Sequence, residues 1–326
     1  TAQDLETGRQ YNPKASAVIN ATGVFADAVL QLEQPGAKPL IQPSQGIHLV
    51  VERSFLPGQD ALMIPKTPDR RVLFAVPWQN KLLLGTTDTL RDEPELEPVA
   101  LEQEISFILQ TAAGYLLKSP ARKDVLSVFA GLRPLAAHQG NPRATKDISR
   151  NFKVILSDNK LTTVTGGKWT IYRKMAEDTL DTLIHAKLLP AQPCKTAHYP
   201  IHGHSTDATS NNHLAAYGTD AGAIEQFILE DAALKMLLHP DYKYTRAEVV
   251  WAARHETART VEDVLARRLR LLFLDAAAAV YAAPTVAAIL AVELRHSQKW
   301  AEEQVNSFTG LALQYTLMPL QTPYKV

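Results

Sequence analysis

Short apolar runs of strand length divide the first half of the chain. Residues 17–20 form a buried-strand pattern that ends at Ala21-Thr22-Gly23, and apolar positions at helical spacing follow over residues 26–32. A strand, a glycine turn and a helix in immediate succession are typical of an α/β domain. We therefore predict that the chain opens with the closing elements of such a domain.

Three further apolar runs predict a small antiparallel sheet. They cover residues 46–51, 71–76 and 81–84, and only the polar turn Gln79-Asn80 and its flanks separate the last two. Runs joined by so short a connection pair as antiparallel neighbours. The pattern predicts an antiparallel meander.

A helix and two longer strand patterns come next. Proline and acidic residues over 92–98 precede a set of apolar positions at helical spacing: Leu101, Ile105, Ile108, Leu109 and Ala112. Residues 125–132 then have a strand pattern. Residues 152–164 have one that folds back on itself at 157–160.

Helical patterns dominate the rest of the chain. After Thr165-Gly166-Gly167 a helix is expected from about residue 168 to residue 186, and the stretch 189–212, rich in proline, histidine, serine and threonine, is expected to be a linker. From residue 215 onward no strand alternation interrupts the helical spacing. We therefore predict an all-α C-terminal domain.

The apolar stretch 271–294 is the one candidate for a membrane span. It is rich in alanine, which contributes little transfer free energy, and Pro284 interrupts it. Two buried helices that meet near Ala283-Pro284 explain it better, because proline ends or kinks a helix. We expect no transmembrane helix.

These patterns together predict an α/β (α+β) fold with an all-α C-terminal domain. The expected boundaries are residues 1–40 for the closing part of a first α/β domain, 41–160 for the antiparallel-sheet domain, 161–190 for the return to the first domain, 191–212 for the linker and 213–326 for the helical domain.

Composition and charge exclude several classes of function. Lysine plus arginine and aspartate plus glutamate both total 34, so no charge excess points to nucleic acid. Cys194 is the single cysteine, which excludes an intrachain disulfide and favours a reducing compartment. His198, His202 and His204 lie close together, but Pro200 and Gly203 fall between them, and we expect no metal site. The polar N-terminus does not resemble a signal peptide, and a cytoplasmic location is expected.

The most informative local motif is Gly166-Gly167-Lys168. Two glycines between a strand and a helix allow the backbone to approach a ligand, and the helix N-terminus and the lysine favour an anionic or electron-accepting group. An ordinary tight turn explains the same pattern. The motif therefore indicates a site only together with others.

Arg133 and His48 are the other candidates. Arg133 ends an apolar strand, where a guanidinium calls for a phosphate, a carboxylate or a structural ion-pair partner. His48 lies inside an apolar strand, either as a base or as a hydrogen-bonded core histidine.

In their order along the chain these motifs resemble the FAD-dependent glycerol-3-phosphate dehydrogenases. Five blocks carry the resemblance, together with a helical tail that contains Glu262-Asp263-Val264-Leu265-Ala266-Arg267-Arg268. The blocks are Val18-Ile19-Asn20-Ala21-Thr22-Gly23, Gly46-Ile47-His48-Leu49-Val50-Val51, residues 72–88, Gly131-Leu132-Arg133-Pro134-Leu135, and residues 166–177 beginning with Gly166-Gly167-Lys168-Trp169-Thr170.

The resemblance implies that the sheet domain, residues 41–160, binds the substrate, next to remnants of a Rossmann-like FAD/NAD(P)-binding domain in residues 1–40 and 161–190. It also implies roles for individual residues. His48, Arg133 and Lys168 would be catalytic, with Arg133 and Thr170 binding the substrate. The cofactor would lie against Ala21, Thr22, Gly23, Gly166, Gly167 and Lys168. The implied reaction is oxidation of glycerol 3-phosphate to dihydroxyacetone phosphate with hydride transfer to FAD, and quinone or oxygen as the final electron acceptor.

The sequence also departs from the family pattern. It contains no Gly-x-Gly-x-x-Gly run and no acidic residue to follow one, so we expect the N-terminal dinucleotide-binding segment to be missing. The chain alone should then bind FAD weakly or not at all and should not turn over. Attachment to the inner face of a membrane and assembly into a homo-oligomer stay open.

Two other interpretations remain. An FAD-dependent amine or amino-acid oxidase of the same fold would use Arg133 to hold a carboxylate. Alternatively, the chain is a cofactor-free module whose C-terminal helices bind a partner protein or a second copy.

Overall fold

The computed structural model describes residues 1–67, 71–136, 151–206 and 213–319. The chain divides into two compact units. The first unit comprises Thr1–Gly46, Asp88–Pro98 and Gly131–Tyr199, and the second comprises Ile47–Thr87, Val99–Ala130 and Pro200–Val326. Strands β4 (Ile41–Glu52) and β9 (Val125–Ala136) each begin in one unit and end in the other. The five domain boundaries expected from the sequence stay a prediction.

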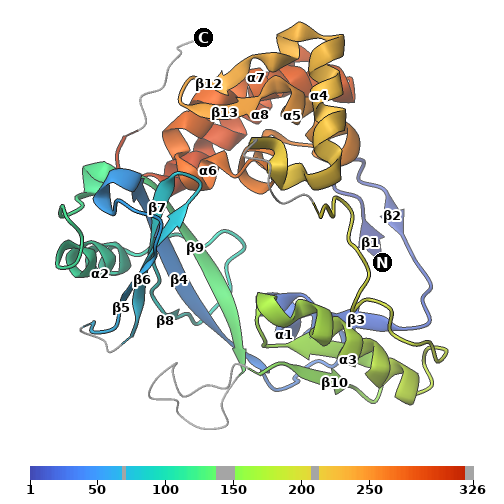
Figure 1. Cartoon of the computed structure of the whole chain (residues 1–326). Coiled ribbons are helices and arrows are strands. Elements are labelled where there is room, and N and C mark those ends of the chain that lie inside the picture. The colour runs from blue at the N-terminus through green and yellow to red at the C-terminus, as the bar shows by residue number, and fades with distance from the viewer. Residues whose placement is uncertain (68–70, 137–150, 207–212, 320–326) are drawn as a thin grey trace. The chain divides into compact units, whose positions relative to one another are not determined.

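A three-stranded sheet organises the first unit. Its order is β10 (Lys153–Leu156), β11 (Leu161–Thr165) and β3 (Val18–Asn20), with β11 antiparallel to β10 and parallel to β3. The helices α1 (Ala26–Glu33) and α3 (Tyr172–His185) both pack against β11 (Figure 1). The predicted fold-back after residue 156 and the predicted helix after Gly167 are thus confirmed. The first unit also has a hairpin that the sequence did not predict, β1 (Ala2–Gln3) with β2 (Gln10–Tyr11).

Asn20 connects the parallel pair to the helix that follows it. Its buried amide donates to the carbonyl of Ala26 at 2.9 Å and to Thr163 Oγ1 at 3.4 Å, and its Oδ1 accepts from the Thr22 hydroxyl. Asp27, in the first turn of α1, accepts from the backbone N–H groups of Leu40 and Ile41 at the start of β4. Buried polar groups are thereby satisfied where strand, turn and helix meet.

The predicted meander lies in the second unit. Strands β5 (Leu62–Ile64), β6 (Leu73–Trp78) and β7 (Lys81–Gly85) are successive antiparallel neighbours, and β7 pairs with β4 so that His48 lies opposite Gly85. The sequence missed β5, which is only three residues long. In the first unit the opening residues of β4 pair instead with β8 (Thr89–Leu90), and β9 also pairs with β4.

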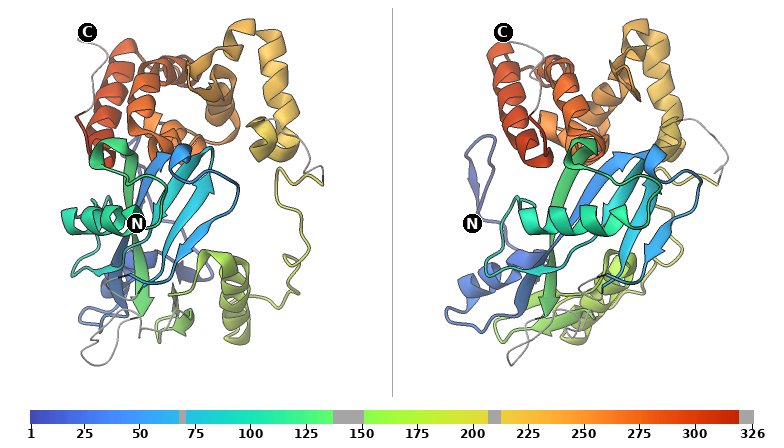
Figure 2. Two further views of the ribbon diagram at one scale, coloured as in Figure 1. Left: turned by 60° about the vertical axis from the view of Figure 1, so that its left-hand side comes forward. Right: turned by 90° about the vertical axis from the view of Figure 1, so that its left-hand side faces the viewer.

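Helix α2 (Glu102–Ala113) covers the meander (Figure 2). Ile105, Ile108 and Ala112 are buried with apolar side chains of β6 and β7 such as Leu73 and Leu84, as the helical spacing predicts. At its start Glu104 is buried, accepting from the backbone N–H of Leu101 and, at 2.7 Å, from the Thr87 hydroxyl.

The remainder of the second unit is mostly helical. Its helices are α4 (Ala221–Glu230), α5 (Arg246–His255), the π-helix η8 (Asp263–Arg268), α6 (Leu271–Leu274), α7 (Ala276–Leu294) and α8 (Gln298–Ala312). Short 3₁₀ helices are η1 (Gly23–Phe25) and η5 (Trp169–Ile171) in the first unit, and η2 (Arg53–Phe55), η3 (Arg122–Asp124), η6 (His213–Asp220), η7 (Ala232–Lys235) and η9 (Leu313–Tyr315) in the second.

The prediction of an all-α C-terminal domain was wrong in one segment. Strands β12 (Leu237–His239) and β13 (Tyr242–Thr245) form a hairpin that turns at Pro240 and Asp241. Strands of three and four residues are too short for an alternating pattern to stand out from the helical spacing around them. Leu237 and Leu238 in β12 are compatible with a helix as well as with a strand.

The expected helix break at Pro284 was also wrong. The break falls at Asp275, whose carboxylate caps α7 by accepting from the N–H of Ala278, and α7 continues through Pro284. The small side chains Ala279 and Ala283 are fully buried in the helical core, so close packing supports the helix where proline removes one hydrogen bond. By length and composition α7 is the one described helix that meets the criteria for a membrane span, but half of its most apolar stretch is buried in this core.

Candidate functional site

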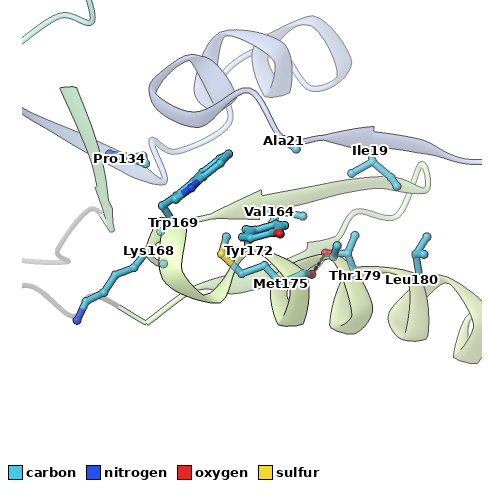
Figure 3. Close-up of a pocket in the computed structure, with 13 residues that line it drawn as sticks. Ile19, Ala21, Pro134, Val164, Lys168, Trp169, Tyr172, Met175, Thr179 and Leu180 are labelled. Carbon is cyan, nitrogen blue, oxygen red and sulfur yellow. Dashed lines mark hydrogen bonds between the residues drawn. The ribbon is translucent and has the colours of Figure 1, made fainter. Parts of the chain in front are cut away.

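The main cavity of the first unit lies where the parallel strands β3 and β11 end. It encloses about 580 Å³. Its lining includes Ile19 of β3, Ala21 directly after β3, and Gly166 and Gly167 after β11. Residues of η5 and α3, including Trp169, Tyr172 and Met175, complete it (Figure 3). Ligands of open α/β sheets bind outside the carboxyl ends of parallel strands. The predicted cofactor residues Ala21, Gly166, Gly167 and Lys168 all line this cavity.

The turn at the cavity requires its two glycines. Gly166 and Gly167 both have left-handed backbones, with φ of 76° and 81°. A Cβ at Gly166 would lie 2.7 Å from the carbonyl oxygen of Asn151, and one at Gly167 would lie 2.6 Å from the sulfur of Met175. Any other residue would therefore be strained and would also displace its neighbours.

Two aromatic residues that the sequence reasoning passed over form the apolar wall of the cavity. The rings of Trp169 and Tyr172 stack with centroids 5.3 Å apart and an angle of 22°, and Trp169 is 85% exposed. An exposed tryptophan on an apolar cavity offers a surface for a planar ring. Aromatic residues three positions apart after a Gly-Gly turn are the sequence pattern that could have revealed this wall.

The other predicted cofactor and substrate residues near this turn differ in position. Lys168 is exposed and extends away from Tyr172 and Met175 (Figure 3). Thr170 is exposed within η5 and does not line the cavity. Thr22 hydrogen-bonds to Asn20, and Gly23 begins η1, so both support the turn after β3.

A second cavity of about 360 Å³ joins Arg133 to the glycine turn. It is lined by residues 132–135 of β9 and by Gly166, Gly167, Lys168 and Trp169. Five of these residues also line the main cavity, namely Pro134, Gly166, Gly167, Lys168 and Trp169. The structure thus brings Arg133 to the same cavity as Gly166-Gly167-Lys168, which follow it by more than thirty positions in the sequence.

Arg133 is held by residues of β4 and of the segment between β7 and β8. Its Nη1 lies 3.7 Å from the carboxylate of Asp88, and Asp88 accepts a short hydrogen bond from the Ser44 hydroxyl. The guanidinium also lies against Gly46, where a Cβ would be only 2.2 Å from Nη2. Asp88 and Gly46 were not selected as site residues from the sequence, because their relation to Arg133 is not local.

His48 belongs to the second unit and has its own set of contacts. Its half-buried ring stacks on Phe129 with centroids 5.4 Å apart, and Phe129 in turn meets the edge of Phe273. The other side of the ring approaches Gly85, where a Cβ would lie 2.2 Å from Cδ2. Phe129 and Gly85 therefore fix the plane of the imidazole.

The histidines of the expected linker do not gather. His202 Nε2 lies 2.7 Å from Asp220 Oδ2, and within the described ranges no group of three histidine, cysteine, aspartate or glutamate side chains is arranged to hold a metal ion.

Two family profiles match the chain. Residues 2–173 match the family described as FAD dependent oxidoreductase. Residues 160–303 match the C-terminal domain of alpha-glycerophosphate oxidase. Together the two matches cover the sheet elements, the glycine turn and most of the helices.

Curated relatives are similar over nearly the whole chain. The mitochondrial glycerol-3-phosphate dehydrogenase SDP6 of Arabidopsis thaliana is 35% identical over 325 residues, which is 90% of this chain and 51% of the relative. A probable mitochondrial glycerol-3-phosphate dehydrogenase of Caenorhabditis elegans is 37% identical over 95% of this chain and 46% of the relative. The chain thus spans about half the length of the curated relatives it matches.

One solved structure shows the fold. The glycerol-3-phosphate dehydrogenase from Bacillus halodurans, determined in complex with FAD, superposes with a TM-score of 0.81 over 99% of this chain and 66% of that chain, at 23% identity. The α/β architecture with a helical C-terminal part is therefore established by backbone similarity as well as by the sequence matches.

Proposed function

The chain belongs to the FAD dependent oxidoreductases and, within them, to the glycerol-3-phosphate dehydrogenase family, and we propose that its protein oxidises sn-glycerol 3-phosphate to dihydroxyacetone phosphate. The resemblance inferred from the motifs is thereby confirmed, as is FAD as the cofactor of the family. The substrate, the acceptor and the roles of individual residues are part of the proposal. The observation that carries it is the cavity shared by Arg133, Lys168 and the Gly166-Gly167 turn.

The main cavity fits the ring system of FAD. Gly166 and Gly167 form the left-handed turn that lines the cavity, and the stacked Trp169 and Tyr172 offer an apolar face. When bound, FAD supplies the acceptor for the hydride that leaves the alcohol carbon. Ala21 and Ile19 would contact the cofactor from the side of β3.

Arg133 is the proposed ligand of the substrate phosphate. A guanidinium binds phosphate through two parallel hydrogen bonds, and Asp88 and Gly46 constrain its position. Lys168 lines the same cavity and adds a second positive charge there. Thr170 stays a predicted substrate contact.

His48 is the proposed base. Oxidation of a secondary alcohol releases the hydroxyl proton, and a neutral imidazole is suited to accept it near neutral pH. The stacked Phe129 and the close approach of Gly85 hold the ring in one orientation, which a proton acceptor requires.

Steady-state kinetics of the full-length protein with a dye acceptor tests the proposal. Arg133→Met should lower kcat/KM for sn-glycerol 3-phosphate by about a hundredfold or more, because it removes charge-assisted hydrogen bonds to phosphate. Arg122→Met removes a surface arginine that pairs with Glu102 and should change little. Equal kinetics for the Arg133 variant and the wild type would refute the assignment, and oxidation of amino acids in place of glycerol 3-phosphate would favour the amine-oxidase alternative.

The isolated chain of 326 residues is proposed to bind FAD weakly and not to turn over, because its sequence has no Gly-x-Gly-x-x-Gly run. A flavin absorption band that stays with the purified chain would contradict this. Quinone or oxygen as acceptor, cytoplasmic location and self-association stay predictions. Oxygen uptake compared with reduction of a soluble quinone distinguishes the two acceptors.

A further inference from the structure

A polar cavity within the second unit is not accounted for by the proposed function. It encloses about 370 Å³, and we call it the Arg270 cavity. Its walls include Gln79 from the β6–β7 turn, Tyr217 from η6, Tyr244 from β13, Glu248 from α5, Glu256 and Arg270. These residues come from segments up to 191 positions apart (79 to 270), so the cavity is a product of the tertiary fold.

The backbone at Arg270 is unusual. The π-helix η8 ends with a bond from the N–H of Leu269 to the carbonyl of Val264, and Arg270 then adopts a left-handed conformation with φ of 60° before α6 begins. Single-turn π-helices and non-glycine residues in this conformation occur preferentially at functional sites. Here they place an arginine at the wall of a cavity.

The carboxylate of Glu248 is already held by hydrogen bonds within the cavity wall. It is almost fully buried and accepts from the backbone N–H of Thr245 at 2.7 Å and from the hydroxyls of Thr245 and Tyr217 at 3.1 and 3.2 Å. His213 Nε2 lies 3.3 Å from Oε2 of Glu248. Glu248 therefore has little capacity left for a ligand.

Three arginines line the cavity, and two of them, Arg267 and Arg268, form ion pairs. Arg267 pairs with Glu262 and Asp263. Arg268 pairs with Asp263 and donates to the backbone carbonyl of Glu256 at 2.6 Å. Across the described residues no hydrogen bond or ion pair is formed by the guanidinium of Arg270, which is exposed.

The hydroxyls in the cavity act as donors. Burial raises the pKa of Tyr244 to about 12 and also raises the pKa of Tyr217, so both side chains stay protonated at neutral pH. Tyr244 donates to Oε1 of Gln79 at 3.2 Å. Because Oε1 of Gln79 accepts that bond, its NH₂ group is left as a further donor in the cavity wall.

Glu256 limits the charge that the cavity accepts. Burial raises the pKa of Glu256 above its ordinary value, against the opposing effect of Arg268. A carboxyl group in this position would repel a dianion more strongly than a monoanion. Phosphate, which is largely dianionic at neutral pH, is thus disfavoured relative to a carboxylate.

We propose that the Arg270 cavity binds a small monocarboxylate, with the guanidinium of Arg270 making two parallel hydrogen bonds to its oxygens. The guanidinium of Arg270 has no ion-pair partner among the described residues, and its planar shape matches a planar carboxylate. The amide of Gln79 serves a hydroxyl group of the ligand. This inference does not depend on the proposed oxidation of glycerol 3-phosphate.

Saturation-transfer NMR of the full chain with sodium L-lactate tests the proposal. Lactamide has the same size without the charge, and inorganic phosphate tests the dianion. The wild type should bind lactate with a Kd on the order of millimolar, and lactamide and phosphate at least about tenfold more weakly. Absence of lactate binding, or equal binding of lactamide, would overturn it.

A matched pair of variants locates the site. Arg270→Gly removes the charge and suits the left-handed backbone, so the variant should fold. Arg295→Gly is the control, because Arg295 is an exposed arginine with the same φ of 60° at the end of α7. We expect lactate binding to weaken about tenfold or more in the first and to be unchanged in the second.

Arg270→Lys provides a second test if the glycine variant unfolds. It keeps the charge and loses the two parallel hydrogen bonds, so lactate affinity should fall about threefold to tenfold while the circular dichroism spectrum stays the same. Unchanged lactate affinity in this variant would overturn the role given to Arg270.

Discussion

The guanidinium of Arg133 lies on the bare backbone of Gly46. A Cβ at that position would be 2.2 Å from Nη2 and 2.7 Å from Cζ. His48 has the same relation to Gly85, where a Cβ would be 2.2 Å from Cδ2 of the ring. Each of these two predicted site residues therefore depends on a glycine on a neighbouring strand segment, and the backbone of neither glycine is left-handed. The two glycines differ in what a side chain would displace.

Gly46→Ala should displace Arg133 at little cost in stability. The clashing atoms are the end of a flexible side chain, which can swing away, so we expect the free energy of unfolding to change by less than about 1 kcal/mol. On the proposed function, KM for sn-glycerol 3-phosphate should rise about tenfold. Urea unfolding measures the change in the free energy of unfolding, and steady-state kinetics of the full-length protein measures the change in KM. Gly131→Ala, at a glycine with open space around it, is the control and should leave KM unchanged.

Gly85→Ala should instead destabilise the second unit. The clashing group is the His48 ring, which would lose its stacking on Phe129 if it moved, so we expect a cost of about 1–3 kcal/mol. A double-mutant cycle in urea checks the cause. In a His48→Ala background the cost of Gly85→Ala should largely disappear. Additive effects of the two substitutions would show that the ring is not what Gly85 accommodates.

Asp88→Asn should impair the positioning of Arg133. Asp88 is 12% exposed, lies 3.7 Å from the guanidinium and accepts from Ser44, so the neutral amide should hold the arginine less firmly. We expect KM for sn-glycerol 3-phosphate to rise about threefold to tenfold with a smaller change in kcat. Asp92→Asn, at an exposed residue of the same segment, is the control. A fall in kcat alone would argue for a role in the chemical step.

Asp263 should make the helical part of the second unit sensitive to acid. Burial alone would raise the pKa of Asp263, but hydrogen bonds from the backbone N–H groups of Arg259 and Thr260 and from the Thr260 hydroxyl outweigh burial and lower it below the ordinary 3.8. A lowered pKa stabilises the fold above the unfolded value, and this contribution is lost as the pH falls through the folded value.

Asp263→Ala should therefore cost about 1–2 kcal/mol at pH 7. The difference from the wild type should shrink once the pH falls below 3.8, because the unfolded chain then takes up a proton that the folded carboxylate binds only at lower pH. Urea unfolding at pH 7, 5 and 3 measures this. Glu262→Gln, which removes a carboxylate paired only with Arg267 on the surface, should have a small effect at each pH. A cost for Asp263→Ala that is independent of pH would exclude the charge as its cause.

Local patterns were sufficient to predict most of the elements. The meander, the fold-back before Leu161 and the turn at Gly166-Gly167 each depend on residues within a few positions of one another, and each is where the sequence placed it. Arg133 and the glycine turn, which local motifs single out, line one cavity, and their roles stay predictions.

What the sequence did not reveal depends on tertiary contacts. Gly46 and Asp88 acquire a role only because Arg133 lies next to them, and Pro284 is tolerated only because alanines pack tightly around α7. The β12–β13 hairpin is too short to show its period. The Arg270 cavity combines residues from five segments and has no sequence signature at all.

The parallel pairing of β3 with β11 sets the order in which the first unit can assemble during synthesis. Asn20 and Thr163 are hydrogen-bonded although 143 positions separate them. At about 5–20 residues per second the ribosome needs on the order of ten seconds to supply the second strand after the first. Over that interval β3 has no partner in its sheet, while residues 47–87 and 99–130 of the second unit are already available to fold. The glycine turn follows β11 directly, so the wall proposed to hold the cofactor is completed only after these residues of the second unit have been made.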